Sequence, residues 1–184
     1  MLTSFLWVRN EGKEVPMKTL TLDNWLLLDP AIAISVRLDE ECQPHPATAS
    51  DWLPAILRYE LADHVPAEVR DLFNVAKGAM AYGLLFLPLF ALATEQLFRV
   101  CEAAVRHRAK LAGATGATRK FQSNLWFLTS KGIIPKDEQD KWESIRRARD
   151  FASHPEQQMV ANPAIAIQIL SSVSDWLNRL YRGA

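Results

Sequence analysis

The sequence has little cysteine and no excess of charge of either sign. Lys and Arg number 21 and Asp and Glu also number 21, so the formal net charge at pH 7 is +0. No global field therefore attracts nucleic acid or acidic lipid, and any site for a polyanion must be a local patch. Two cysteines in 184 residues are too few for a disulfide framework. Since the first residues also lack the features of a signal peptide, we expect a cytoplasmic protein.

The most apolar run of the sequence, Ala79 to Ala93, carries no charge. A membrane-spanning helix needs roughly 20 apolar residues. This run is shorter, contains Gly83 and Pro88, and is soon followed by Glu95. Proline ends one helix and suits the first turn of the next. We therefore expect two buried helices that meet at Pro88 and no membrane contact.

Residues 1–65 are the least regular part of the sequence, and we expect an N-terminal extension that packs on the rest of the chain. Apolar and polar residues alternate on both sides of 10–13, which fits a short β-hairpin. Further along, Asp23 and Asn24 fit equally well the cap of a short helix that stops before Pro30. The two interpretations stay open.

A loop and then a helix are expected at the end of this extension. Prolines and small polar residues around Pro44 and Pro46 are typical of a loop or linker. Ser50 or Asp51 suits the cap of a helix over 52–62. The apolar run before the loop cannot be assigned to a helix or a strand from its period alone.

From residue 66 onward the apolar residues follow the three-and-four spacing of amphipathic helices. Prolines, glycines and polar caps mark where each helix begins and ends. The expected helices run from Pro66 to about Gly83, from Pro88 to about Leu111, from Thr118 to about Lys131, from Pro135 through Trp142, and from Pro163 to about Tyr181. We therefore predict a mainly α fold, with an antiparallel four- to five-helix bundle over 66–184.

One face of the second of these helices carries charges of alternating sign. Glu95, Arg99, Glu102 and Arg106 follow the three-and-four spacing, which places them side by side on the helix surface. The apolar stripe from Leu89 to Leu111 lies opposite. The pattern is typical of a solvated face.

The stretch from Trp142 to Pro155, WESIRRARDFASHP, holds the one compact group of residues with chemical potential. At about 100° per residue, four of its residues share a core face: Trp142, Ile145, Ala148 and Ala152. Arg149 lies within about 50° of that face by the same count. A semi-buried guanidinium needs a carboxylate or a phosphate, because an unpaired buried charge is costly.

The polar partners in this stretch depend on where the helix ends. Asp150 and His154 are four residues apart, so they can hydrogen-bond and raise the basicity of the imidazole, and Arg146 extends the same stripe. In an unbroken helix Arg149 and His154 lie about 140° apart and cannot converge on one ligand. Either the helix ends before Pro155, or a second copy of the chain supplies one of the two side chains.

The segment 149–154, Arg-Asp-Phe-Ala-Ser-His, resembles the Arg, polar residue, three residues, His motif of the HEPN superfamily (higher eukaryotes and prokaryotes nucleotide-binding domains). The resemblance implies a small antiparallel helical bundle, typically a homodimer, with the motif beside the last helix. For members that are nucleases it implies RNA cleavage without a metal or cofactor. Arg149 would then contact the phosphate, His154 would transfer a proton around the ribose 2′-hydroxyl, and Asp150 would orient the site. Many members of the superfamily are non-catalytic.

A second cationic stretch, residues 106–120, covers the end of one predicted helix and the start of the next. It contains no acidic residue and is compatible with a phosphate-backbone patch, or with charges that complement helix ends. With Arg146, the candidate nucleic-acid-binding residues are Arg106, Arg108, Lys110, Arg119 and Lys120.

Other motifs carry less weight. Cys42 and His45 have a ligand-like spacing but no second pair, so no metal site is predicted. The segment 113–116 lacks the Lys-Ser/Thr ending of a phosphate-binding loop.

Two hypotheses follow. The first is an HEPN-like RNA-binding or metal-independent endoribonuclease domain, in which Arg149 and His154 share an exposed cleft at a dimer seam. The alternative is a non-catalytic helical protein-interaction or regulatory module, as in bacterial defence or toxin–antitoxin systems. It predicts that an internal carboxylate holds Arg149 and that an apolar patch is exposed elsewhere.

Overall fold

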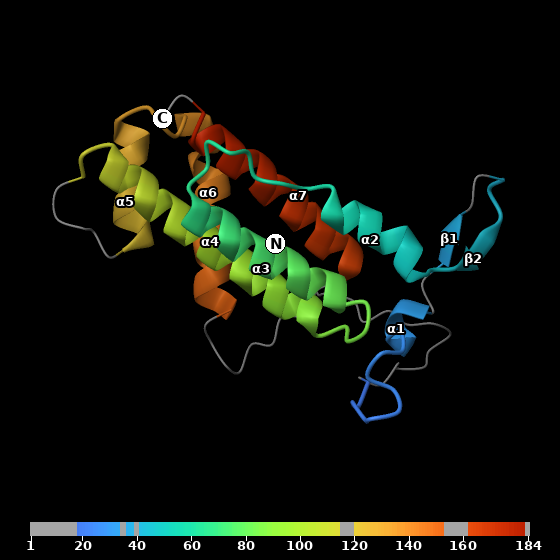
Figure 1. Ribbon diagram of the computed structural model, residues 1–184. Coiled ribbons are helices and arrows are strands. Elements are labelled where there is room, and N and C mark those ends of the chain that lie inside the picture. Colours follow the sequence, from blue (N-terminus) through green and yellow to red (C-terminus); the bar gives the residue numbers. More distant parts are fainter. Residues whose placement is uncertain (1–17, 34–35, 39–40, 115–119, 153–161, 183–184) are drawn as a thin grey trace.

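The computed structural model describes residues 18–33, 36–38, 41–114, 120–152 and 162–182. It is mainly helical, as predicted, and its helices pack into one bundle (Figure 1). The helices after residue 66 are α3 (Ala67–Tyr82), α4 (Leu89–Leu111), α5 (Phe121–Ser130), α6 (Gln139–Ala152) and α7 (Pro163–Leu180), with a 3-10 turn at Lys136–Glu138.

The predicted start and stop residues place most of these helices correctly. Asn162 caps α7, because its Oδ1 accepts from the backbone N–H of Ala164 at 2.8 Å, and Pro163 occupies the first turn. The helix α4 begins directly after Pro88. Gly113 follows its end with a φ of +84°, a conformation that favours glycine.

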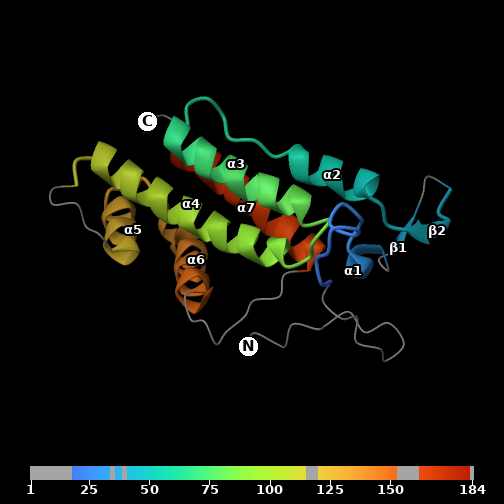
Figure 2. The same ribbon diagram turned by 60° about the horizontal axis from the view of Figure 1, so that its bottom comes forward.

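The central helix of the bundle is α4, which packs against α3, α5, α6 and α7. Figure 2 shows α5 and α6 on one side of α4, and α2 and α3 on the other. The apolar run at Ala79 to Ala93 forms the end of α3, a short connection and the start of α4. No helix in the described part of the chain combines the length and apolarity needed to cross a membrane.

The apolar spacing predicts core positions for Leu111 at the end of α4 and for Ile165 at the start of α7, but both side chains are exposed. Leu111 is 58% exposed because it ends α4, beyond the helices that cover it, and Ile165 in the first turn of α7 is 38% exposed. The core side of α7 instead carries Ala166 and Leu170, both 0% exposed. Ile165 and Ala166 are adjacent, so their side chains point about 100° apart on the helix. The apolar spacing placed Ile165 in the core, whereas the structure places Ala166 there.

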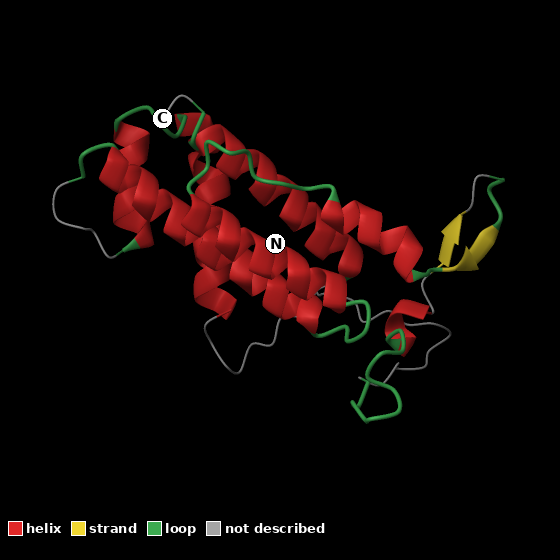
Figure 3. Cartoon of the chain, viewed as in Figure 1, coloured by secondary structure: helices red, strands yellow, loops and turns green. Residues whose placement is uncertain are grey.

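The N-terminal region contains short elements whose places differ from the prediction. These are α1 (Pro30–Ala33), β1 (Val36–Leu38), β2 (Pro44–Pro46) and α2 (Ala49–Leu57). The strands β1 and β2 pair antiparallel at the edge of the molecule (Figure 3). The proline-rich stretch predicted as a loop therefore supplies one strand. The earlier hairpin predicted around 10–13 lies mostly outside the described residues, and the end of its second strand, residues 18–22, forms no strand.

Two helical expectations in this region are wrong. The residues after Asp23 and Asn24 form turns and not a short helix, because the Asn24 side chain accepts from the N–H of Thr21 and donates to the carbonyl of Thr19. The helix expected over 52–62 begins at Ala49 and ends at Leu57.

The cap and the end of α2 explain this shift. The backbone N–H of Thr48 donates to the Asp51 carboxylate at 2.7 Å, so the helix is capped earlier than expected. After α2 the chain runs extended because α7 binds its backbone: Ser174 Oγ and Asn178 Nδ2 both donate to the carbonyl of Glu60.

Buried charges attach residues 18–33 to the bundle. Asp29 is 1% exposed, and its Oδ2 accepts from the N–H of Leu87 at 2.8 Å. Lys18 Nζ donates to the carbonyls of Leu27 and Leu85 at 2.7 and 2.8 Å. These bonds satisfy both charges, as burial requires, and they fix this region on the connection between α3 and α4.

Candidate functional site

The helix α6 has the core face predicted from its sequence. Trp142 is 2% and Ile145 5% exposed, and the Trp142 ring lies 6.2 Å from the ring of Trp176 on α7. This packing places Arg149 at the edge of the core, with 39% of its side chain exposed. The side chain of Ala152, the last residue of the predicted core face, lies outside the described residues.

The guanidinium of Arg149 is held by a carboxylate of α4. Its Nε donates to Glu102 Oε2 at 3.1 Å, and its Nη2 lies 3.0 Å from the same oxygen in an ion pair. Only 22% of the Glu102 side chain is exposed. A guanidinium presents donors in a fixed plane, so these two contacts to one oxygen fix the direction in which Arg149 points.

Asp150 is the second carboxylate beside Arg149. It accepts from Arg149 Nη1 at 3.2 Å and from Arg146 Nη1 at 2.7 Å. Arg146 in turn donates to Glu143 at 2.8 Å, and this hydrogen bond raises the pKa of Arg146. We name the five residues Glu102, Glu143, Arg146, Arg149 and Asp150 the charge cluster. Three carboxylates and two guanidiniums give it a formal charge of −1.

The remaining candidate catalytic residue, His154, lies outside the described residues. The hydrogen bond expected between Asp150 and His154 therefore stays a prediction, as does the cleft expected between Arg149 and His154. Arg146 was expected on the same stripe as Asp150, and the two side chains do meet. Asp150 therefore binds both Arg146 and Arg149, and it holds the two guanidiniums beside each other.

The alternating charges of α4 do not all face solvent as predicted. Arg99 and Arg106 are exposed, but Glu102 turns toward α6 and binds Arg149. A helical wheel gives the direction of a side chain but not the neighbour that covers it. The sequence signal was present in Arg149 itself, whose place at the core edge required an anionic partner.

The second cationic stretch divides in the structure. Arg106, Lys110 and Lys120 are exposed. Arg108 is less available to bind a phosphate, because its Nε donates to the carbonyl of Leu180 at the end of α7 at 3.2 Å. Its role there is to satisfy a helix carbonyl. Arg119 lies outside the described residues.

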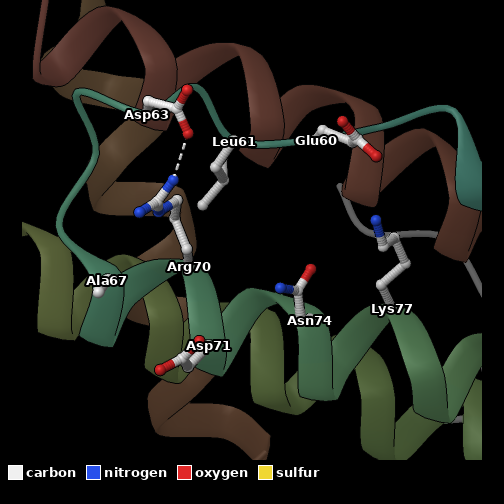
Figure 4. Close-up of a pocket in the computed structure, with 8 residues that line it drawn as sticks. All are labelled: Glu60, Leu61, Asp63, Ala67, Arg70, Asp71, Asn74 and Lys77. Carbon is white, nitrogen blue, oxygen red and sulfur yellow. Dashed lines mark hydrogen bonds and ion pairs between the residues drawn. The ribbon is translucent and has the colours of Figure 1, made fainter.

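Sequence reasoning missed a polar hollow of about 320 Å³ between α3 and the extended segment after α2. Figure 4 shows that Arg70 reaches Asp63, while Asn74 and Lys77 point from α3 toward the extended segment. Lys77 Nζ also donates to the carbonyl of Tyr59 at 3.2 Å. Arg70, Asn74 and Lys77 are four and three residues apart, a spacing that places them on one face of α3 and that could be read from the sequence. The other wall of the hollow is the extended segment after α2, whose position no sequence pattern predicts.

A second missed feature is an apolar loop between Lys18 and Asp29. Leu22 is 93%, Leu26 60% and Trp25 55% exposed.

Among the residues that the structure describes, no three His, Cys, Asp or Glu side chains form a group that can hold a metal ion. No protein-family model, curated protein sequence or solved structure matches this chain.

Proposed function

We propose that this chain is an HEPN-like helical module that binds RNA at the face shared by α4 and α6, with Arg149 as a phosphate contact. The observation that carries the proposal is the state of the Arg149 side chain. It is 39% exposed, and Glu102 holds it in a fixed direction beside two turns of α4 that also bear Arg99 and Arg106. A preoriented guanidinium at the surface is suited to phosphate recognition.

The charge around Arg149 sets a condition on this function. The charge cluster alone has a formal charge of −1 and repels a phosphate. The exposed cations Arg99, Arg106 and Lys110 of α4 change the sum to +2. These cations therefore favour phosphate binding at Arg149, and this binding is sensitive to salt because exposed charges are screened over about 10 Å at 0.1 M ionic strength.

The proposal extends to cleavage through His154, five residues after Arg149 in the sequence. In this scheme the imidazole takes part in proton transfer around the ribose 2′-hydroxyl, and Arg149 stabilises the charge on the phosphate. Histidine suits this role because its side chain can take up and release a proton near neutral pH. A homodimer is part of the proposal, because a second copy brings another Arg149 and His154 to the same seam.

The test is incubation of several RNAs with the wild type and with His154→Ala, in the presence of a chelator. The two proteins are first matched for their free energy of unfolding. We expect cleavage by the wild type, its loss in the variant, and no effect of the chelator. Intact RNA with both proteins would falsify the nuclease role, and cleavage that the chelator abolishes would contradict the metal-free mechanism.

A second candidate function, a non-catalytic interaction module, is favoured by two observations. Carboxylates engage Nε, Nη1 and Nη2 of Arg149, and the loop with Leu22, Trp25 and Leu26 is exposed. Exposed apolar side chains of this kind are typical of protein interfaces. In this case His154→Ala and Arg149→Gln leave RNA untouched, as does the wild type.

A further inference from the structure

We propose that Arg99, Arg106 and Lys110 form a track on α4 that follows the phosphate backbone of a single RNA strand over several nucleotides. We name these three residues the cationic ridge. The inference rests on the proposed RNA binding and names the form of RNA that this face takes. Arg99 and Arg106 come from the charge pattern that predicted a solvated face, and Arg106 and Lys110 were candidate nucleic-acid-binding residues.

Helical geometry aligns the three cations. Arg106 follows Arg99 by seven residues and Lys110 follows it by eleven. At about 100° per residue, these positions deviate by only about 20° to either side of the direction of Arg99. At about 1.5 Å per residue, the ridge is about 16 Å long. The three charges therefore form a nearly straight row along one helix.

The burial pattern of α4 agrees with this geometry. From Leu89 to Lys110, the only exposed residues are Leu92 and the three members of the ridge. Among the residues that the structure describes, none of the three ridge cations makes an ion pair. Arg106 and Lys110, one turn apart, repel each other, and a polyanion that lies along the ridge removes this repulsion.

Glu102 links the ridge to Arg149. It lies between Arg99 and Arg106 in the sequence, and about 60° to one side of Arg99 on the helical wheel. Its carboxylate faces α6 and binds Arg149. The charge cluster therefore meets α4 at Glu102, between Arg99 and Arg106 in the sequence, so a strand on the ridge passes close to Arg149.

The spacing of the ridge excludes a single phosphate as its ligand. Adjacent cations are about 10 Å and about 6 Å apart along the helix axis. Arg106 and Lys110, one turn apart, can share a phosphate, but the whole ridge, about 16 Å long, cannot converge on one phosphate group. One nucleic-acid strand places a phosphate about every 3.4 Å of helix axis. This is the spacing of a strand within a duplex, and an extended single strand has its phosphates farther apart, so the ridge corresponds to at most about five nucleotides. Binding is independent of base sequence because backbone contacts carry no base information.

The experiment is fluorescence anisotropy with a labelled single-stranded RNA of about 12 nucleotides, a length within the usual range of sites for single strands. The wild type is compared with a ridge variant that carries Arg99→Gln, Arg106→Gln and Lys110→Gln. The matched control carries Arg58→Gln, Lys131→Gln and Lys136→Gln, which remove the same charge from exposed positions outside α4. Affinities are measured over a series of salt concentrations.

The expected result is a change in salt dependence. Each phosphate contact contributes about 0.7 to the slope of log affinity against log salt for a single strand. The ridge variant should bind more weakly and lose about 2 from this slope, whereas the control follows the wild type. Inorganic phosphate should displace the labelled RNA no more than another salt does at the same ionic strength.

Three results would overturn the inference, and they are distinguishable. RNA binding by the wild type that depends on Arg149 but not on the ridge contradicts the track and leaves the proposed function intact. No binding by the wild type contradicts both. Competition by polyglutamate that equals competition by RNA of the same charge shows that the ridge takes an acidic protein segment and not a nucleic-acid strand.

Discussion

Arg149 on α6 donates from Nε to Glu102 Oε2 on α4 at 3.1 Å, across 47 residues of sequence, and its Nη2 lies 3.0 Å from the same oxygen. The contact joins the two helices at the end of α6 that precedes His154. The core contacts of Trp142 and Ile145 hold α6 along the rest of its length. The pair therefore fixes both the position of α6 and the direction of its guanidinium.

We expect a measurable coupling between Glu102 and Arg149. In a double-mutant cycle with Glu102→Gln and Arg149→Gln, the coupling in the free energy of unfolding should be about 0.5–1 kcal/mol. The value is modest because Arg149 is 39% exposed and water screens the pair. Urea denaturation of the four proteins measures it. Strictly additive effects would show that the two charges contribute independently.

Two glycines near the end of α3 give opposite responses to the same substitution. A Cβ at Gly83 meets the Phe90 ring at 2.7 Å and the Met80 carbonyl at 2.9 Å, whereas a Cβ at Gly78 has nothing within 4 Å. Gly83→Ala should therefore destabilise the fold by about 1–3 kcal/mol through overpacking. Gly78→Ala should stabilise it by about 0.5–1 kcal/mol, because alanine has less freedom to lose in a helix. Thermal unfolding compares the two, and equal shifts would contradict the packing at Phe90.

Local signals in the sequence were sufficient for most of the bundle. Pro88, Asn162 and Pro163 mark helix starts through their own backbone chemistry, and the period of α6 placed Trp142 and Ile145 in the core. Such signals act within a few residues, so they require no knowledge of the neighbours. The bundle could therefore be predicted before any contact was known.

The candidate site was only partly predictable, because its contacts are tertiary. The position of Arg149 required an anionic partner, but its choice of Glu102 depends on how α6 lies on α4. The same packing shows that Arg108 binds the carbonyl of Leu180 while Arg106 stays exposed. In the N-terminal region the side-chain bonds of Asn24 and of Asp51 decided the elements: the first holds turns where a helix was expected, and the second caps α2 earlier than expected.

The two cysteines should differ sharply in reactivity. Cys42 is exposed, whereas Cys101 on α4 is 0% exposed and burial raises the pKa of its thiol. Because the thiolate is the reactive form, a thiol reagent at about pH 8 should label one cysteine of the folded protein and the second only after unfolding. Cys42→Ser should abolish the fast phase. Two fast equivalents in the wild type would show that α4 is not covered at Cys101.

The same raised pKa predicts a loss of stability at alkaline pH. A thiol whose folded pKa lies above its unfolded value of about 8.5 stabilises the fold fully below that pH. The contribution falls as pH rises further, by up to about 1.4 kcal/mol per pH unit. Burial raises the pKa of Tyr181 as well, but its contribution begins to fall only from about pH 10. Between these values Cys101→Ala should flatten the pH dependence measured by urea denaturation.

The most direct test of RNA binding at Arg149 is the affinity of a labelled single-stranded RNA for the wild type and for Arg149→Gln at low salt. Arg179→Gln is the control, because it also removes an arginine that pairs with a carboxylate, Glu138, but at α7. The loss of one charge-assisted contact, about 1.5–3 kcal/mol, predicts binding at least about tenfold weaker for Arg149→Gln and unchanged for Arg179→Gln. Equal affinity of all three proteins, or no binding by the wild type, would contradict the role of Arg149 as a phosphate contact.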